Sequence, residues 1–139
     1  MMTTPEAVFH FRVPPQPLQA RVARENVIAF AASHGIAHQY VAHFLSVLGE
    51  AIANAIEHAA TAEPIDIELR LGSDRLVATV RDFGIGFDPG ASASSTLPDA
   101  RAERGRGLPI MRSSADIFAI ESFLGKGTTV VVGVVFPAA

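Results

Sequence analysis

The hydrophobic period of this chain changes near Pro64, and this change limits the folds that the chain can adopt. Between Leu18 and Ala60 the apolar residues recur every three or four positions, as on one face of an α-helix. After Pro64 they alternate with polar residues, as in strands that have one face in water. A chain that makes helices and then strands of this kind can bury both apolar surfaces by laying the helices on one face of a sheet.

The first part of the chain predicts a strand at 6–13 and two helices, at 18–34 and 37–60. Gly35 stands between the helices, where a glycine commonly ends a helix in the left-handed conformation. The second helix has the stronger three-four periodicity. Its apolar seam consists of Val41, Phe44, Leu45, Leu48, Ile52, Ile56 and Ala59.

The second part of the chain predicts two β-hairpins, and hairpins favour an antiparallel or mixed sheet. The strands are expected at 65–71, 75–82, 116–123 and 127–136. Between the hairpins, residues 89–103 are rich in Ser, Ala and Pro and predict a long loop, followed by a short helix near 108–115. We therefore expect an α/β (α+β) two-layer sandwich, with a mixed and mostly antiparallel sheet covered on one face by helices, as a single domain over 1–139.

The composition excludes several classes of protein. The chain has 139 residues, of which 49% are hydrophobic, so it can bury a core and is not a disordered polymer. Its net charge of −3 argues against a direct nucleic-acid binder, and the absence of cysteine excludes disulfides and a thiol nucleophile. Neither a signal segment nor an apolar run near the roughly 20 residues of a membrane span occurs. We expect a cytoplasmic protein without membrane contact.

The second predicted helix carries a polar stripe that needs an explanation. Glu50, Asn54 and His58 follow one another at intervals of four, with Val47 on the same stripe, roughly opposite the apolar seam. A solvated helix face would explain the stripe. A magnesium-nucleotide site would explain it too, with Asn54 as an oxygen ligand of Mg²⁺ and Glu50 as a proton acceptor. His58 is interpreted as a helix-end residue, or one that supports the site from behind, rather than a metal ligand.

The D-x-G-x-G motif ends the strand at 75–82 and consists of Asp82, Gly84 and Gly86. One interpretation is a turn in which the glycines adopt positive φ and Asp82 caps the backbone. Another is a site where the backbone approaches a ligand closely, with Asp82 accepting a hydrogen bond from an exocyclic amine such as that of adenine. The motif by itself leaves both interpretations open.

The R-G-R-G-L motif lies just before the short helix expected near 108–115. Backbone N–H groups at the start of a helix bind anions, and arginine side chains add charged donors. The motif therefore predicts a phosphate-binding loop, although a glycine pair before a helix is weak evidence by itself. Its residues are Arg104, Gly105, Arg106, Gly107 and Leu108.

Taken in order, the E-x-x-x-N pair on a helix, the D-x-G-x-G motif after a strand and the glycine pair before a short helix resemble the N, G1 and G2 boxes of the GHKL or Bergerat-fold ATPases. The resemblance covers roughly residues 18–135, and about 88–104 falls where the family keeps its ATP lid. Thr128 or Thr129 falls where the family has a threonine near the adenine.

The resemblance implies a Bergerat ATP-binding fold with ATP and Mg²⁺ as cofactors. It implies that Asp82 binds the adenine amine, that Asn54 holds Mg²⁺ between the phosphates, and that Glu50 orients or deprotonates the hydroxyl that is phosphorylated. The residues of the R-G-R-G-L motif would bind phosphate oxygens, and the lid would exclude water. Phosphoryl transfer depends mainly on such positioning and charge neutralisation.

Within that family the chain resembles the anti-sigma-factor serine kinases of the RsbW type. This resemblance implies a serine/threonine kinase that binds a sigma factor and phosphorylates a serine on a STAS-domain anti-anti-sigma partner. Homodimers are common in the group. The alternative is a non-catalytic module in which ATP or ADP sets the affinity for a partner. A kinase for another protein and a fragment of a histidine kinase are further alternatives, of which the fragment is the weaker.

Overall fold

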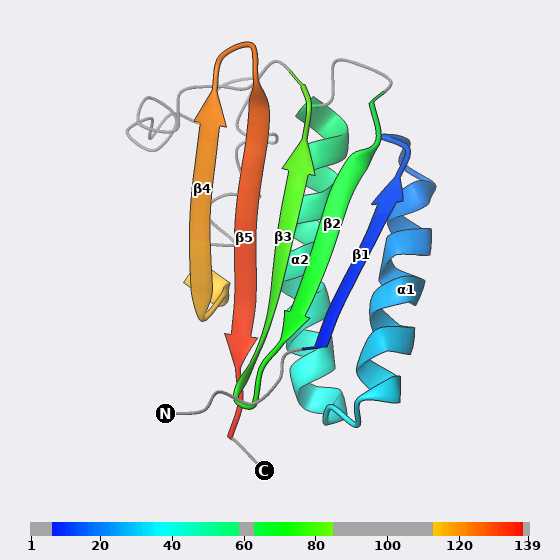
Figure 1. Ribbon diagram of the computed structural model, residues 1–139, viewed down its shortest axis with the longest axis vertical. Helices are drawn as coiled ribbons and strands as arrows, with labels where there is room; N and C mark the ends of the chain where they lie inside the picture. The colour runs from blue at the N-terminus through cyan, green and yellow to red at the C-terminus, as the bar shows by residue number, and fades with distance from the viewer. Residues whose placement is uncertain (1–6, 59–62, 85–112, 138–139) are drawn as a thin grey trace.

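The computed structural model describes residues 7–58, 63–84 and 113–137, which form two helices and five strands in two layers (Figure 1). The elements are β1 (Ala7–Val13), α1 (Gln19–Ser33), α2 (His38–His58), β2 (Ile65–Leu71), β3 (Arg75–Asp82), β4 (Ile117–Phe123) and β5 (Gly127–Val135). The strands are ordered β1-β2-β3-β5-β4, and all four pairings between these strands are antiparallel. The predicted α+β sandwich is confirmed.

Both helices lie on the same face of the sheet, with α2 against β3 and β5 and α1 against β1 (Figure 1). The connection between them is a tight one, because Gly35 has φ 68° and lets the backbone reverse. The N–H groups of Gly35 and Ile36 donate to the carbonyl oxygens of Ala32 and Ala31, each across 3.2 Å. This is the Schellman arrangement that a glycine after a helix predicts.

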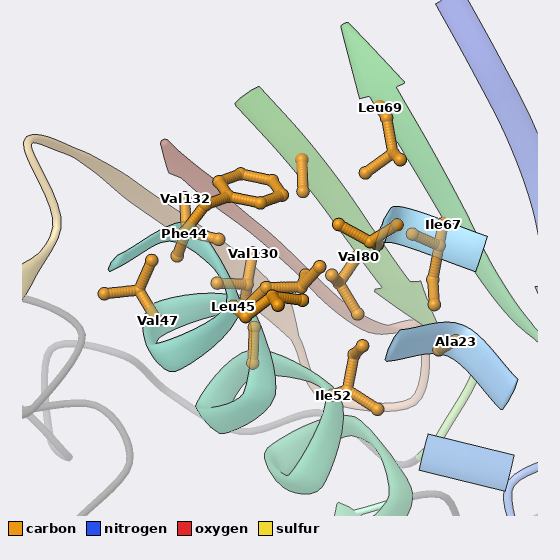
Figure 2. Close-up of a cluster of buried hydrophobic side chains, with 14 of the residues drawn as sticks. Ala23, Phe44, Leu45, Val47, Ile52, Ile67, Leu69, Val80, Val130 and Val132 are labelled. Carbon is orange, nitrogen blue, oxygen red and sulfur yellow. The ribbon is translucent and has the colours of Figure 1, made fainter. Parts of the chain in front are cut away.

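The strands bury alternate residues, as the period of two in the sequence predicts. In β2 the side chains of Ile65, Ile67 and Leu69 are fully buried against the helices, whereas Arg70 is exposed on the opposite face. Figure 2 shows how Phe44 and Leu45 of α2 meet the sheet residues that face them. Each such aliphatic or aromatic side chain contributes about 1.5–3 kcal/mol by leaving water.

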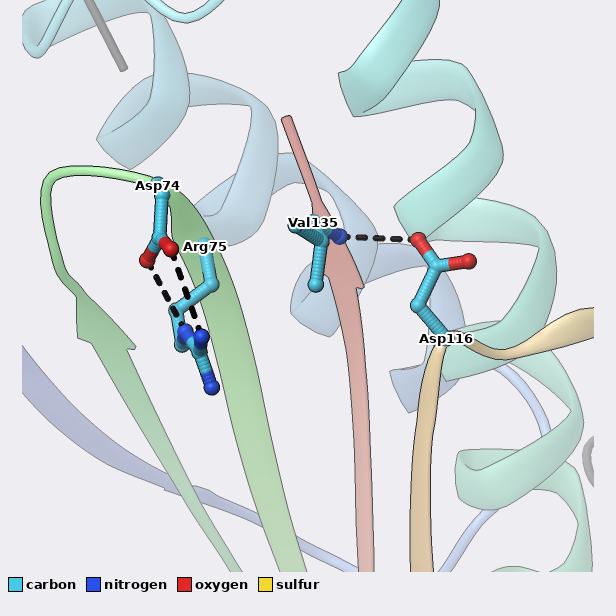
Figure 3. A network of polar contacts seen from close by, with 4 residues as sticks. All are labelled: Asp74, Arg75, Asp116 and Val135. Carbon is cyan, nitrogen blue, oxygen red and sulfur yellow. Dashed lines mark hydrogen bonds and ion pairs between the residues drawn. The ribbon is translucent and has the colours of Figure 1, made fainter. Parts of the chain in front are cut away.

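Polar contacts fix the ends of the strands that lie farthest from Asp82 (Figure 3). Nε of Arg75 donates to Oδ1 of Asp74 across 2.9 Å at the turn between β2 and β3. The carboxylate of Asp116 accepts the N–H of Val135 across 2.8 Å, which joins the start of β4 to the end of β5. The Asp74–Arg75 contact is local to its turn, whereas the Asp116–Val135 contact joins two strands, and neither contributes to the candidate site.

Several predicted features lie outside the described residues. They are the loop at 89–103 and most of the short helix near 108–115, of which Ser113 and Ser114 are described and helical. The carbonyl of Ser114 accepts a hydrogen bond from Nε2 of His43 across 2.7 Å, so the chain that leads into β4 is tied to α2. In the described part of the chain, neither helix is long and apolar enough to cross a membrane.

Candidate functional site

The polar stripe of α2 borders the buried face of the helix and is not turned to solvent along its whole length. Val47 is fully buried and Asn54 is 4% exposed, whereas Glu50 between them is half-buried. The buried arc is wider than the predicted seam and also includes Ala51 and Ala55. A plain solvated face is therefore excluded for Asn54.

Among the described residues, the buried amide of Asn54 lacks the hydrogen bonds that such a group needs. In the described part of the chain, neither Oδ1 nor Nδ2 of Asn54 has a hydrogen-bond partner. An unpaired buried amide is costly, and each such group in a folded protein calls for an explanation. A ligand that binds the amide oxygen would explain it. Mg²⁺ binds oxygen ligands, including amide oxygens, so the side chain fits the predicted metal-binding role.

Asp82 ends β3 on the face that carries the helices and is 1% exposed. Its Oδ1 accepts the N–H of Gly84 across 2.9 Å, which is the backbone turn predicted for this motif. Burial raises the pKa of the Asp82 carboxyl above its ordinary value of 3.8, while N–H donors from Gly84 and Thr128 and the charge of His58 lower it in part. A desolvated carboxylate with free lone pairs can accept hydrogen bonds from an amine.

Two glycines allow the backbone to close around Asp82. A Cβ atom on Gly84 would lie 2.1 Å from the carbonyl oxygen of His58, the last residue of α2. A Cβ atom on Gly127 would lie 2.2 Å from the backbone oxygen of Asp82, and Gly127 also has φ 89°. These contacts bring the ends of α2, β3 and β5 together. His58 is therefore a helix-end residue, as predicted.

The threonine that faces the candidate site is Thr128. It lies directly opposite Asp82 in the register of β3 and β5, and its side chain is 2% exposed. Thr129 points to the other face of the sheet, because successive side chains of a strand alternate. There it lies between Arg81 and Glu121, which are both exposed.

Ser122 is a site residue that the sequence prediction missed. Its Oγ lies 2.7 Å from Oγ1 of Thr128 and 3.3 Å from the carbonyl oxygen of Gly127, and the residue is 6% exposed. The signal was present in β4, since Ser122 follows Phe118 and Ile120 at intervals of two and so belongs to the inner face.

The structure thus brings Asp82 and Gly84 at the end of β3 together with Thr128 on β5 and with the end of α2, the helix on which Glu50 and Asn54 lie one turn apart. The remaining predicted residues lie outside the described part of the chain, and their roles stay predictions. They are Gly86, Arg104, Gly105, Arg106, Gly107 and Leu108.

The described residues offer Mg²⁺ a single amide rather than a cage of ligands. Among these residues, no group of three His, Asp or Glu side chains could hold a metal ion. This agrees with the chemistry of Mg²⁺, which is commonly bound by one or two protein groups together with substrate phosphates. Asn54 therefore fits a metal that arrives with a nucleotide.

Comparison with known proteins places this geometry in a family. The family model for the histidine kinase-like ATPase domain matches residues 13–133. The anti-sigma F factors of Geobacillus stearothermophilus and Geobacillus kaustophilus are each 32% identical over 114 residues, which cover 78% of this chain and 78% of theirs. The anti-sigma F factor of Clostridium beijerinckii is 28% identical over 116 residues, covering 79% of this chain and 81% of its own.

A crystal structure of the RsbU and RsbW domains of a Mycobacterium tuberculosis protein has the same fold. It superposes with a TM-score of 0.70 over 95% of this chain, at 20% sequence identity. The match spans 34% of that longer chain. The architecture described above is therefore that of a solved structure, although the sequences have diverged widely.

Proposed function

The chain belongs to the family of histidine kinase-like ATPase domains, and from this premise we propose that it is an anti-sigma factor that is also an ATP-dependent serine/threonine kinase. Its substrate in this proposal is a serine on a STAS-domain anti-anti-sigma protein, and its second partner is a sigma factor. The names of the anti-sigma F factors to which the chain is similar support this class of partner.

The observation that carries the proposal is the buried amide of Asn54, which has no hydrogen-bond partner in the described residues. No described residue forms a hydrogen bond with this amide, whereas Mg²⁺ bound to a nucleotide would bind its oxygen. Mg²⁺ held there would neutralise charge on the phosphates. On the same side of the fold, Asp82 has lone pairs for the adenine amine, and Thr128 lies beside it. In this proposal Asn54, Asp82 and Thr128 bind the nucleotide, and none of them takes the proton that phosphoryl transfer releases.

Glu50 supplies the group that phosphoryl transfer needs beyond binding. It lies one helical turn before Asn54 and is half-buried, so its carboxylate can reach a hydroxyl that approaches the phosphates. In the proposed step the partner's serine oxygen forms a bond to the γ-phosphorus, and the bond from that phosphorus to the oxygen that bridges it to the β-phosphate breaks. The serine proton passes to Glu50, and ADP leaves.

Transfer of labelled phosphate from Mg-ATP to STAS-domain proteins of the source organism tests the proposal. The wild type is compared with Glu50→Gln, with Asp82→Asn and with Glu57→Gln, which changes an exposed carboxylate on the same helix. We expect the wild type and Glu57→Gln to phosphorylate a serine. Glu50→Gln should bind nucleotide without transfer, and Asp82→Asn should bind it weakly.

The outcomes separate the kinase from the alternative. A wild type that binds ATP or ADP and changes its affinity for a partner, but transfers phosphate to no STAS-domain protein, would favour the non-catalytic module. A wild type that binds no nucleotide would contradict the assignment of all three motifs. Pull-down of a sigma factor by the wild type, released by the unphosphorylated STAS-domain protein, checks the anti-sigma role.

A further inference from the structure

Three buried polar side chains form one row across the sheet beside the candidate nucleotide site. Asp82 of β3 lies opposite Thr128 of β5, which lies opposite Ser122 of β4. Directly opposed residues in antiparallel strands have Cβ atoms about 4.5–5.5 Å apart, so the three side chains are neighbours. Their exposed fractions are 1%, 2% and 6%. Each must therefore obtain its hydrogen bonds from the protein or from a ligand.

The two hydroxyl groups of the row have one proton each, and the surrounding acceptors decide where those protons go. The carbonyl of Gly127 can only accept, so Ser122 is the donor across the 3.3 Å that separates them. The oxygens of Ser122 and Thr128 are 2.7 Å apart, a distance typical of a good O–H···O hydrogen bond. Because Ser122 donates its proton to the carbonyl of Gly127, Thr128 is the donor in the hydrogen bond between the two hydroxyl groups.

The reverse direction is less favourable in the folded chain. If Ser122 donated to Thr128, the Thr128 proton would need another acceptor. Among the described residues the hydroxyl of Thr128 is hydrogen-bonded to Ser122 and to no other residue. A buried donor without an acceptor costs free energy, so the direction from Thr128 to Ser122 to Gly127 is preferred.

This direction determines what the row offers to a ligand. The carboxylate of Asp82 already accepts the N–H groups of Gly84 and Thr128, and when ionised it has only lone pairs to offer. Thr128, whose proton is held by Ser122, likewise offers only lone pairs. The row therefore accepts hydrogen bonds and donates none.

We propose that Ser122 determines base specificity by holding the Thr128 hydroxyl as an acceptor, so that the row binds a 6-aminopurine nucleotide and rejects a 6-oxopurine nucleotide. The inference rests on the proposed function, because it assumes that the base of the nucleotide lies against this row. An amino group at position 6 donates to the row. An oxo group at the same position faces lone pairs and is repelled.

Equilibrium binding of Mg-ATP and Mg-ITP, which carry an amino and an oxo group at position 6, tests the inference. The variants are Ser122→Ala and, as a control, Ser46→Ala, which removes an exposed hydroxyl on α2. The wild type should prefer ATP by about 100-fold or more, because a site built to pair with one group rejects its isostere. Ser122→Ala frees the Thr128 proton to donate to the oxo group, so the preference should fall about tenfold, whereas Ser46→Ala should change it by less than about twofold.

The results distinguish this inference from the proposed function. A wild type that binds neither nucleotide overturns both. A folded Ser122→Ala protein that keeps the full preference of the wild type overturns the inference alone. If Ser122→Ala does not fold, Thr128→Val and Thr128→Ser replace it. The inference then requires that Thr128→Val weaken ATP but not ITP and that Thr128→Ser keep the preference, and equal weakening of both nucleotides by Thr128→Val overturns it.

Discussion

Replacing Asn54 by leucine should stabilise the nucleotide-free protein while abolishing its response to a magnesium nucleotide. Both polar atoms of the Asn54 side chain are buried without a partner in the described part of the chain. An unpaired buried amide costs about 1–3 kcal/mol. Leucine has the same branched shape without polar atoms, and it gains about 0.5 kcal/mol of helix propensity over asparagine. We therefore expect Asn54→Leu to raise the free energy of unfolding by about 1.5–3.5 kcal/mol.

Asn26→Leu is the matched control, because Asn26 is a half-buried asparagine in the other helix, α1. It should gain only the propensity difference of about 0.5 kcal/mol. In a chain of this size 1 kcal/mol raises the melting temperature by roughly 3–5 °C. The melting temperature of Asn54→Leu should thus exceed that of Asn26→Leu by roughly 3–15 °C.

Thermal unfolding followed by circular dichroism, with and without Mg-ATP, measures both effects. A nucleotide at 100 times its Kd stabilises the wild type and the Asn26→Leu control by about 2.7 kcal/mol, whereas Asn54→Leu should show no such shift. An Asn54→Leu protein that melts at or below the control without nucleotide would refute the reasoning. In that case the amide would be hydrogen-bonded in the folded protein, and its burial would say nothing about a ligand.

Two further predictions concern the backbone and the carboxylate at the site. Gly127→Ala should lower the free energy of unfolding by at least about 3 kcal/mol and Gly125→Ala by about 1 kcal/mol, because both have positive φ but only at Gly127 would a Cβ meet another backbone segment. Urea titration measures the difference, and equal losses would contradict it. Because the folded protein holds the Asp82 proton more tightly than the unfolded chain, stability should fall as pH rises from 3.8 through the raised pKa of Asp82. Asp82→Asn should remove this fall in stability. The prediction is contradicted if the free energies of unfolding of the wild type and of Asp82→Asn change in parallel between pH 3 and 8.

The α2 stripe shows where sequence periodicity was insufficient. Asn54 and Glu50 were placed one turn apart correctly, but the sequence left open whether their stripe faces water or a ligand. Helical geometry gives the angle between two side chains and not the width of the surface that the partner layer covers. The covered surface includes Ala51 and Ala55, whose small size does not mark them as buried in the sequence.

The strand pattern predicted more of the site than the helix pattern did. The boundaries of β3, 75–82, were predicted to the residue, and the alternation within it places Asp82 on the inner face. The choice between Thr128 and Thr129 required the register of β5 against β3. Recognising Ser122 as a site residue required the pairing of β4 with β5 as well, because no local motif marks a serine near the end of a strand.

By itself the sequence determined the order of helices and strands, the reversal at Gly35 and the candidate motifs, because period, turn residues and motif spacing are local properties of a chain. Tertiary structure alone decided that Asn54 is buried with no hydrogen-bond partner within 7–58, 63–84 and 113–137, and that Asp82, Thr128 and Ser122 form one row. These features depend on which strands are neighbours and on how closely a helix approaches the sheet. Contacts between residues far apart in the chain set both.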